Sequence, residues 1–261
     1  MTLSVVIITK NEEANIGRTL ASVSWADERI VLDSGSTDRT IDIARQHKTT
    51  IFQESWSGYA AQKNSAISKA SGEWVLSIDA DEEVSVELAD SIRRAISDNA
   101  RVTGYFMSRR NFFLGKWMRH GGFYPDRKLR LFRRGKGQFI ERAVHETVRV
   151  DGDTAILRGD LIHNAFPTLT AYIETMNRYS SLGGEIALEK RRIGRSLLAF
   201  TANVYCRPAV NFIWNYIVRG GFLDGREGLL LHLYHNVYVS WKYAKAWEAA
   251  RQSAAGQPSS H

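Results

Sequence analysis

The chain has 261 residues, of which 44% are hydrophobic, a formal net charge of +7 and a single cysteine. A chain of this length and composition can bury a full hydrophobic core, which excludes an intrinsically disordered protein. One cysteine excludes an internal disulfide and a cysteine-based zinc cluster, and it fits a reducing compartment.

The charge is distributed unevenly along the chain. Residues 1–100 carry 10 Lys/Arg against 16 Asp/Glu, whereas residues 101–150 carry 13 against 3. A basic block beside an acidic half favours an anionic partner: a phosphorylated substrate, nucleic acid or an anionic membrane surface. Because the first residues run straight into a strand-like segment, without a signal-peptide pattern, we expect a cytoplasmic protein.

Strand-like and helical patterns alternate over the first hundred residues. Strands are predicted at 3–9, 29–32, 50–53 and 74–78, and helices at 14–24, 37–46, 59–70 and 83–97. This alternation predicts an α/β fold, with a Rossmann-like, mostly parallel sheet flanked by helices.

The pattern changes after residue 100. Short β-type runs at 105–109 and 128–132 extend the sheet and supply the acceptor side of a cleft, and from Thr168 onward the chain is helical and aromatic. We therefore expect four parts: a Rossmann-like half (1–100), a second half of the same domain (101–167), a helical appendage (168–252) and a disordered tail (253–261).

The appendage has two long apolar stretches, 197–218 and 229–241. Neither is a clean transmembrane span, because the first contains Arg207 and Pro208 and the second contains two histidines and an asparagine. Their aromatic residues interleave with basic ones: Arg191, Arg192, Arg195, Arg219, Lys242 and Lys245. This mixture is typical of helices lying in a lipid headgroup layer, so we predict a membrane-peripheral appendage, with a helical appendage packed on the sheet as the alternative.

Two carboxylates, Asp79 and Asp81, follow the fourth predicted strand. At the carboxyl end of a strand they can share one hard divalent cation, Mg²⁺ or Mn²⁺, which completes its shell with water and a substrate diphosphate. The alternative is the acidic N-terminus of a helix, since Glu82 and Glu83 come next.

Polar residues also end the first two strands, at Thr9 to Glu13 and at Asp33-Ser34-Gly35. In a parallel sheet all of these ends lie on one edge. The chain lacks glycine-rich phosphate loops, so phosphate charge would be met by the metal. Asp33 can accept a hydrogen bond from a base imide or a ribose hydroxyl, or it can be an ordinary turn residue.

Four segments resemble, in order and spacing, the signature blocks of glycosyltransferase family 2, whose enzymes have the GT-A fold. They are 4–13, 33–40, Lys63-Asn64 and 70–82. The later run 124–132, with Val144-His145-Glu146 and the basic, aromatic tail, is similar to the lipopolysaccharide core glucosyltransferase branch.

The resemblance implies an inverting transfer of a hexose, most simply glucose, from a UDP-sugar to a lipid-linked saccharide such as the lipopolysaccharide inner core. It implies that the nucleoside is held by Thr9, Asn11, Glu13 and Asp33. It further implies that Lys63 approaches the diphosphate, and that Asp79 and Asp81 engage the ribose and the metal. One departure is Ser34, where many members have a second Asp, which puts the nucleotide preference in doubt.

An inverting transfer needs a general base near the acceptor hydroxyl. Carboxylates are scarce between 101 and 150, and we predict Glu146 as the base, with His145 orienting it or contacting the acceptor and Asp126 as the second candidate. A surface salt bridge is the alternative role of Glu146.

Four basic residues near the second β-type run alternate with apolar ones: Lys128, Arg130, Arg133 and Arg134. A strand there would turn its basic side to an anionic acceptor, or simply to solvent.

Two other functions remain open at this point. A nucleotidyltransferase also uses paired acids on Mg²⁺, although the chain lacks a basic, glycine-rich loop near residue 10. A non-catalytic nucleic-acid-binding protein would explain the basic middle, but no known nucleic-acid motif supports it, so we expect no nucleic-acid partner.

Overall fold

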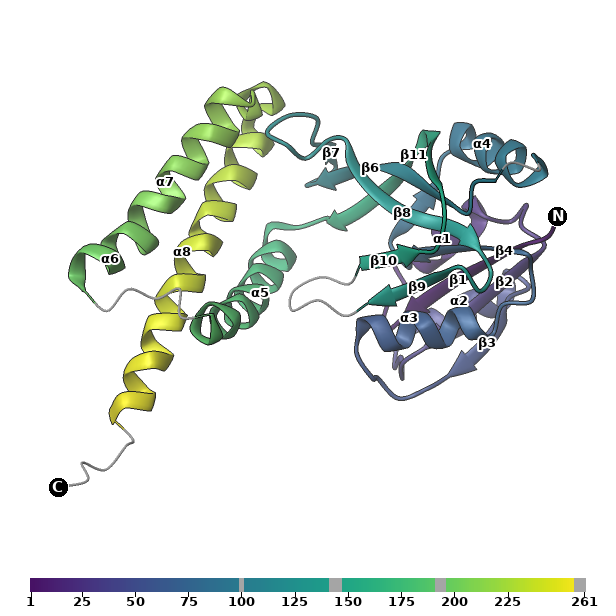
Figure 1. Ribbon diagram of the computed structural model, residues 1–261, viewed down its shortest axis with the longest axis horizontal. Coiled ribbons are helices and arrows are strands. Elements are labelled where there is room, and N and C mark those ends of the chain that lie inside the picture. The colour runs from purple at the N-terminus through teal and green to yellow at the C-terminus, as the bar shows by residue number, and fades with distance from the viewer. Residues whose placement is uncertain (99–100, 141–146, 191–195, 256–261) are drawn as a thin grey trace. The chain divides into compact units, whose positions relative to one another are not determined.

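The computed structural model describes residues 1–98, 101–140, 147–190 and 196–255. The chain divides into two compact units (Figure 1). Unit 1 comprises Met1–Asn111 and Pro125–Ala165, and unit 2 comprises Phe112–Tyr124 and the chain from Phe166 onward. The structure thus groups residues 112–124 with the C-terminal helices, and not with the second half of the sheet domain.

The N-terminal elements follow the predicted alternation. They are β1 (Leu3–Thr9), α1 (Ile16–Ser22), β2 (Glu28–Asp33), α2 (Thr40–Gln46), β3 (Thr50–Gln53), α3 (Tyr59–Ser68), β4 (Trp74–Asp79), β5 (Glu82–Val84) and α4 (Val86–Ser97). The strands that follow are β6 (Gly104–Phe113), β7 (Lys116–Trp117), β8 (Asp126–Arg133), β9 (Gly137–Ile140), β10 (Thr147–Val150) and β11 (Thr154–Phe166).

The parallel part of the main sheet has the order β3-β2-β1-β4, and the order continues through β8, β6, β11 and β5. Thr9 is paired in register with Asp33, and Ile8 with Asp79. The carboxyl ends of β1, β2 and β4 therefore lie side by side on one edge, as predicted. The α/β fold class is confirmed.

Both faces of this sheet are covered, which explains why β1 is apolar throughout. Val5 belongs to one buried cluster with Leu20 of α1 and Leu88 of α4, whereas Val6 belongs to a second cluster with Ala66 of α3. Successive side chains of a strand point to opposite faces, so a run without polar gaps is the pattern of a sheet buried on both sides.

The prediction of a helix at 83–97 is wrong at its N-terminal end. Residues Glu82–Val84 form β5, which pairs antiparallel with β11, and α4 begins only at Val86. Ser85 caps this helix, because its side chain accepts a hydrogen bond from the Leu88 N–H. The acids after Asp81 are therefore not a helix N-terminus.

Unit 2 is mostly helical. Its helices are α5 (Leu169–Glu189), α6 (Leu197–Thr201), the π-helical η1 (Ala202–Cys206), α7 (Arg207–Phe212), the π-helical η2 (Ile213–Val218), the 3₁₀ helix η3 (Gly221–Asp224) and α8 (Gly225–Ala255). Among the described helices, none is long and apolar enough to cross a membrane.

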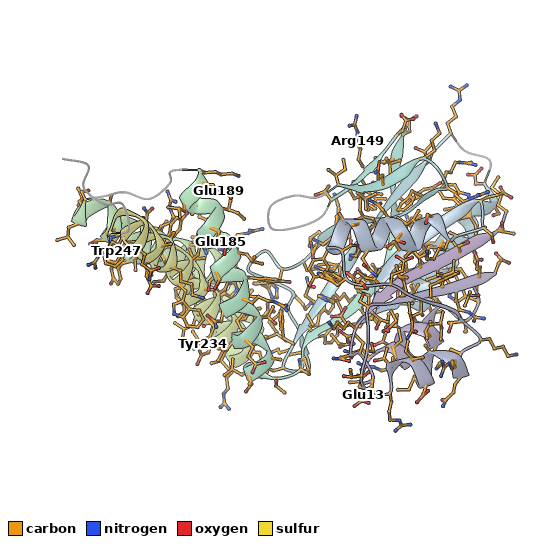
Figure 2. All side chains as sticks on the ribbon, turned by 90° about the horizontal axis from the view of Figure 1, so that it is seen from below. Glu13, Arg149, Glu185, Glu189, Tyr234 and Trp247 are labelled. Carbon is orange, nitrogen blue, oxygen red and sulfur yellow. The ribbon has the colours of Figure 1, made fainter. Side chains whose placement is uncertain are left out.

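Helices α5 and α8 lie side by side, as Glu185 and Glu189 on α5 and Tyr234 and Trp247 on α8 make visible (Figure 2). Gly184 allows this approach, because a Cβ there would lie 3.1 Å from the Lys242 carbonyl oxygen. Helix α8 continues to Ala255, so the predicted tail does not begin at residue 253, and residues 256–261 lie outside the described part of the chain.

Candidate active site

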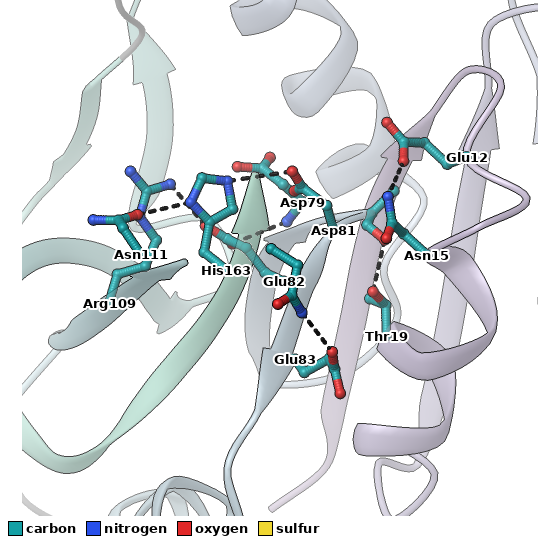
Figure 3. Close-up of polar contacts among 12 residues, drawn as sticks. Glu12, Asn15, Thr19, Asp79, Asp81, Glu82, Glu83, Arg109, Asn111 and His163 are labelled. Carbon is teal, nitrogen blue, oxygen red and sulfur yellow. Dashed lines mark hydrogen bonds and ion pairs between the residues drawn. The ribbon is translucent and has the colours of Figure 1, made fainter. Parts of the chain in front are cut away.

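The turn between β4 and β5, together with strand β11, brings Asp81 next to a histidine. Strand β11 places His163 opposite Glu82, and the Asn164 N–H donates to the Asp81 carbonyl at 3.2 Å. The His163 Nε2 lies 3.2 Å from the Asp81 Oδ2. Figure 3 shows the imidazole ring between Asp81 and Asn111.

Asn111 fixes the orientation of this ring. Its Oδ1 lies 2.7 Å from the His163 Nδ1, while its Nδ2 donates to the Asp126 Oδ2 at 3.3 Å. Because the amide donates to Asp126, its oxygen is the atom that faces His163 and accepts from the Nδ1–H. The Nε2 lone pair is then free to face Asp81, which is the arrangement of a metal-ligating histidine.

The Asp81–His163 pair fits a divalent cation. Two ligand atoms at right angles on an octahedral ion with bonds of about 2.1 Å lie about 3 Å apart. Within the described residues no group of three or more potential ligands occurs. Two protein ligands are enough for Mg²⁺ or Mn²⁺, which keep water and substrate phosphates as their other ligands.

Asp79 lies between two basic side chains. Its Oδ1 lies 2.6 Å from the Lys63 Nζ and its Oδ2 lies 2.6 Å from the Arg130 Nη2. Burial alone would raise the pKa of Asp79, but Arg130 and Lys63 outweigh it and hold this pKa far below its usual range. The two cations compete with a metal ion for this carboxylate, so the side chain that best accompanies Asp81 as a candidate ligand is His163, whereas the sequence predicted Asp79.

Glu82 completes an ion-pair network that joins helix α3 and four strands. We call it the buried network, and its members are Lys63, Asp79, Glu82, Arg109, Arg130 and Asp126. Glu82 is fully buried, and its Oε1 lies 3.0 Å from both Arg109 and Arg130. Burial opposes its ionisation, but Arg130 and Arg109 hold the pKa of Glu82 below its usual value.

Arg130 therefore does not face an acceptor. It is 5% exposed and points into the buried network, so the prediction that the basic residues share one exposed strand face is wrong for this residue. Pairing with two buried carboxylates is what makes its own burial possible.

Asp126 is also engaged. Its Oδ2 lies 2.8 Å from the Arg109 Nη2 and its Oδ1 lies 2.9 Å from the Lys128 Nζ. Arg109 and Lys128 together overcome the effect of burial and lower the pKa of Asp126. A carboxylate with a depressed pKa is a weak base, which disfavours Asp126 as the general base.

The other two predicted acceptor-binding residues, Arg133 and Arg134, lie at the edge of the sheet away from Asp79. Arg133 is paired with Trp74 at the start of β4, and its guanidinium lies 4.8 Å from the Trp74 ring centroid. The Arg134 N–H donates to the Glu73 carbonyl. Both are thus at the amino end of β4, opposite to Asp79, which corrects their predicted acceptor role.

Two of the residues predicted to hold the nucleoside, Asn11 and Glu13, form hydrogen bonds within the protein. Asn11 has a positive φ of 55° and accepts from the Thr37 N–H at 2.8 Å, and Glu13 accepts from the Arg39 N–H at 3.1 Å. These contacts fasten the loops after β1 and β2 to each other.

Asp33 is fully buried and accepts hydrogen bonds from the Gly35 and Ser36 N–H groups and from the Ser36 hydroxyl. This is the turn role that the sequence left open for it. The neighbouring Thr9 and Ser34 hydroxyls are buried, with no hydrogen-bond partner among the described residues. Buried hydroxyls of this kind are suited to a ligand.

Glu12 adds an acid near Asp81. Burial raises the pKa of Glu12, and the nearby Asp81, Asp38 and Asp79 charges raise it further. Its Oε2 accepts from the Asn15 side chain at 2.8 Å (Figure 3).

Glu146 and His145 lie outside the described residues. In contrast, the structure adds four candidate residues that sequence reasoning missed: Glu82, Arg109, Asn111 and His163. The only local signal for the last was a histidine in the β-type run Leu161-Ile162-His163.

Comparison with known proteins identifies the family of the chain. The sequence model of glycosyl transferase family 2 matches residues 4–162. The chain belongs to glycosyltransferase family 2.

Two similar glycosyltransferases align with most of the chain. The lipopolysaccharide core biosynthesis glycosyltransferase LpsC of Rhizobium meliloti (strain 1021) is 30% identical over 254 residues, 94% of this chain and 92% of that protein. An uncharacterized glycosyltransferase of Rickettsia prowazekii (strain Madrid E) is 33% identical over 240 residues, 85% of this chain and 81% of that protein.

The fold is that of GT-A glycosyltransferases. The crystal structure of S. aureus TarS 1-349 in complex with UDP-GlcNAc aligns with 97% of this chain and 92% of that chain, at a TM-score of 0.50 and 15% identity. The chain is therefore a family 2 glycosyltransferase. The two alternative interpretations, a nucleotidyltransferase and a non-catalytic nucleic-acid-binding protein, are no longer needed.

Proposed function

We propose that this family 2 enzyme transfers a hexose, glucose in the simplest case, from a UDP-sugar to a lipid-linked saccharide such as the lipopolysaccharide inner core, with inversion at the anomeric carbon. The similarity to LpsC supports the acceptor class, because it covers 94% of the chain and thus includes unit 2. With such an acceptor, we expect a peripheral protein on the cytoplasmic face of the membrane.

The observation that carries the chemistry is the Asp81–His163 pair, with 3.2 Å between Oδ2 and Nε2. These two residues would hold Mg²⁺ or Mn²⁺, which when bound neutralises the charge that develops on the leaving diphosphate. In the transfer, the acceptor hydroxyl oxygen bonds to the anomeric carbon, the bond from that carbon to the UDP oxygen breaks, and the hydroxyl proton passes to a base.

The donor lies along the edge formed by β1, β2 and β4 in this proposal. The unpartnered hydroxyls of Thr9 and Ser34 face the nucleoside, while Asn11, Glu13 and Asp33 keep the surrounding loops in place. Lys63 supports the donor indirectly, because its ammonium holds the Asp79 carboxylate in the orientation for a ribose hydroxyl.

The proton acceptor in this proposal is Glu146, with His145 beside it, since Arg109 and Lys128 weaken Asp126 as a base. Of the four predicted acceptor-binding residues, only Lys128 is retained, because it lies at the same end of β8 as Asp126.

The test is a product analysis. The protein is incubated with separate UDP-sugars and with truncated lipid-linked cores, and the products are weighed by mass spectrometry. We expect the mass of one hexose residue to be added from UDP-glucose when Mg²⁺ or Mn²⁺ is present. Transfer from a donor other than a UDP-sugar, or to a soluble acceptor alone, would contradict the proposal.

A further inference from the structure

The helical run from Leu197 to Val218 exposes large apolar side chains. Six of them form what we call the apolar stripe: Leu197, Leu198, Val210, Ile213, Ile217 and Val218. Their exposed fractions run from 53% at Ile217 to 82% at Leu198. Soluble proteins rarely leave so many large apolar side chains uncovered on one element, so the stripe calls for a covering surface.

The stripe follows a four-residue repeat, in which outward positions come in pairs such as Ile213/Trp214 and Ile217/Val218. In an α-helix a four-residue repeat drifts around the axis by about 40° per step. The π-helical turns η1 and η2 turn through a smaller angle per residue, and so keep the pairs on one side.

The opposite side of this run packs on α8 through apolar contacts such as Val204 with Tyr243, and also through hydrogen bonds. Asn211 donates to the Asn236 side chain at 3.0 Å, and Arg207 donates to the Tyr243 hydroxyl at 2.7 Å. Large apolar side chains on the outside, together with polar side chains between the helices, differ from the usual pattern of a water-exposed helix. Hydrogen bonds between helices and apolar outer faces are typical of helices in contact with lipid.

The positive charge of this part of the chain favours an anionic covering surface. Residues 190–223 contain six Lys/Arg and no Asp/Glu. A second copy of the chain would bring like charges together, whereas anionic lipid headgroups would neutralise them. Tyr205 and Trp214, which are 71% and 55% exposed, have the amphipathic rings that favour the headgroup level.

We propose that the apolar stripe is immersed at the boundary between the headgroups and acyl chains of an anionic lipid bilayer, with the run Leu197–Val218 lying in the membrane plane. This inference rests on the proposed function and deepens it, because it names the surface through which an enzyme with a lipid-linked acceptor meets the membrane.

The test is vesicle flotation of the full chain with phosphatidylglycerol-containing or pure phosphatidylcholine vesicles. The double variant Ile213→Asp with Ile217→Asp places charge on the stripe, and the matched control, Val86→Asp with Ile156→Asp, makes the same change at exposed apolar residues of unit 1. We expect the wild type and the control to float with anionic vesicles, and the stripe variant to lose binding by about tenfold or more. Equal flotation of the stripe variant overturns the proposal.

Brominated lipids provide a readout that does not need the charged variant to fold. They should quench the wild-type tryptophan fluorescence more than that of Trp214→Phe, and equal quenching overturns the proposal. A wild type that forms dimers without lipid and fails to bind anionic vesicles would instead make the stripe an interface between copies. None of these measurements reads sugar transfer, so a chain that binds vesicles but moves no hexose contradicts only the proposed function.

Discussion

The orientation of His163 depends on a single amide, that of Asn111. Its Oδ1 accepts from the His163 Nδ1–H and its Nδ2 donates to Asp126, so the amide sets which ring nitrogen faces Asp81. Residues that orient a metal-ligating histidine in this way usually affect metal affinity more than the chemical step.

Asn111→Leu should therefore weaken the metal site and leave the fold intact. We expect the Mn²⁺ concentration for half-maximal transfer to rise by about 10–100-fold. We also expect kcat to recover at saturating Mn²⁺. The measurement is the transfer rate as a function of Mn²⁺ concentration.

Asn164→Leu is the matched control, because Asn164 is the next residue of β11 and its side chain contacts Glu83 instead of His163. It should leave the Mn²⁺ dependence unchanged. A kcat that stays low at saturating Mn²⁺ in Asn111→Leu would mean that Asn111 acts on the chemical step and not on the metal.

At the scale of the elements, the buried network joins the parallel strands to the antiparallel ones. Arg130 on β8 links Asp79 at the end of β4 to Glu82 on β5, and Arg109 on β6 continues the link to Asp126. Removing one partner from such a network leaves buried charge without compensation, which costs far more than a surface ion pair.

Arg130→Met should lower the free energy of unfolding by about 3–5 kcal/mol at neutral pH. Arg133→Met, three residues further along the same strand, is the control and should cost about 1 kcal/mol, because the main loss is a ring contact with Trp74. Urea unfolding followed by circular dichroism measures both, and equal costs for the two variants would contradict the role of the network.

The same network makes the free energy of unfolding depend on pH. The folded-state pKa values of Asp79 and Glu82 are lowered, so their stabilising contribution is complete above the ordinary carboxyl range of about 4 and is lost as pH falls below it. The wild type should lose stability between about pH 5 and 3. Arg130→Met should lose less over this interval, since Arg130 is the largest contribution that lowers both pKa values.

Sequence reasoning predicted the strands of the parallel sheet almost residue by residue, because each is a short apolar run between turn residues. Strands β1 and β3 match their predicted ranges, and the three strand ends share one edge. It could not find β5 or β11, because β5 is three residues long and pairs with a strand some 80 positions later. His163 reaches Asp81 only through this pairing, so local pattern could not reveal the second ligand.

At the scale of the whole molecule, residues 112–124 belong to unit 2, although the chain before and after them belongs to unit 1. Phe113 and Met118 share an apolar cluster with Tyr172 and Leu231, and Asp224 accepts hydrogen bonds from the Arg119 and His120 N–H groups. These contacts link positions about 50 to 120 residues apart. The sequence placed the same segment with the sheet, because adjacency along the chain was the only guide.

The full chain allows one decisive measurement of the Asp81–His163 pair. Mn²⁺ is titrated, in the presence of UDP, into chelator-treated wild type, Asp81→Asn, His163→Gln and the control Glu83→Gln, and the heat of binding is recorded. We predict that Asp81→Asn and His163→Gln each weaken Mn²⁺ binding by about 100-fold or more. This loss exceeds the usual effect of changing a residue that only orients a metal ligand. Glu83→Gln should bind Mn²⁺ as the wild type does. Undiminished Mn²⁺ binding by Asp81→Asn would contradict the assignment of this pair as the cation site.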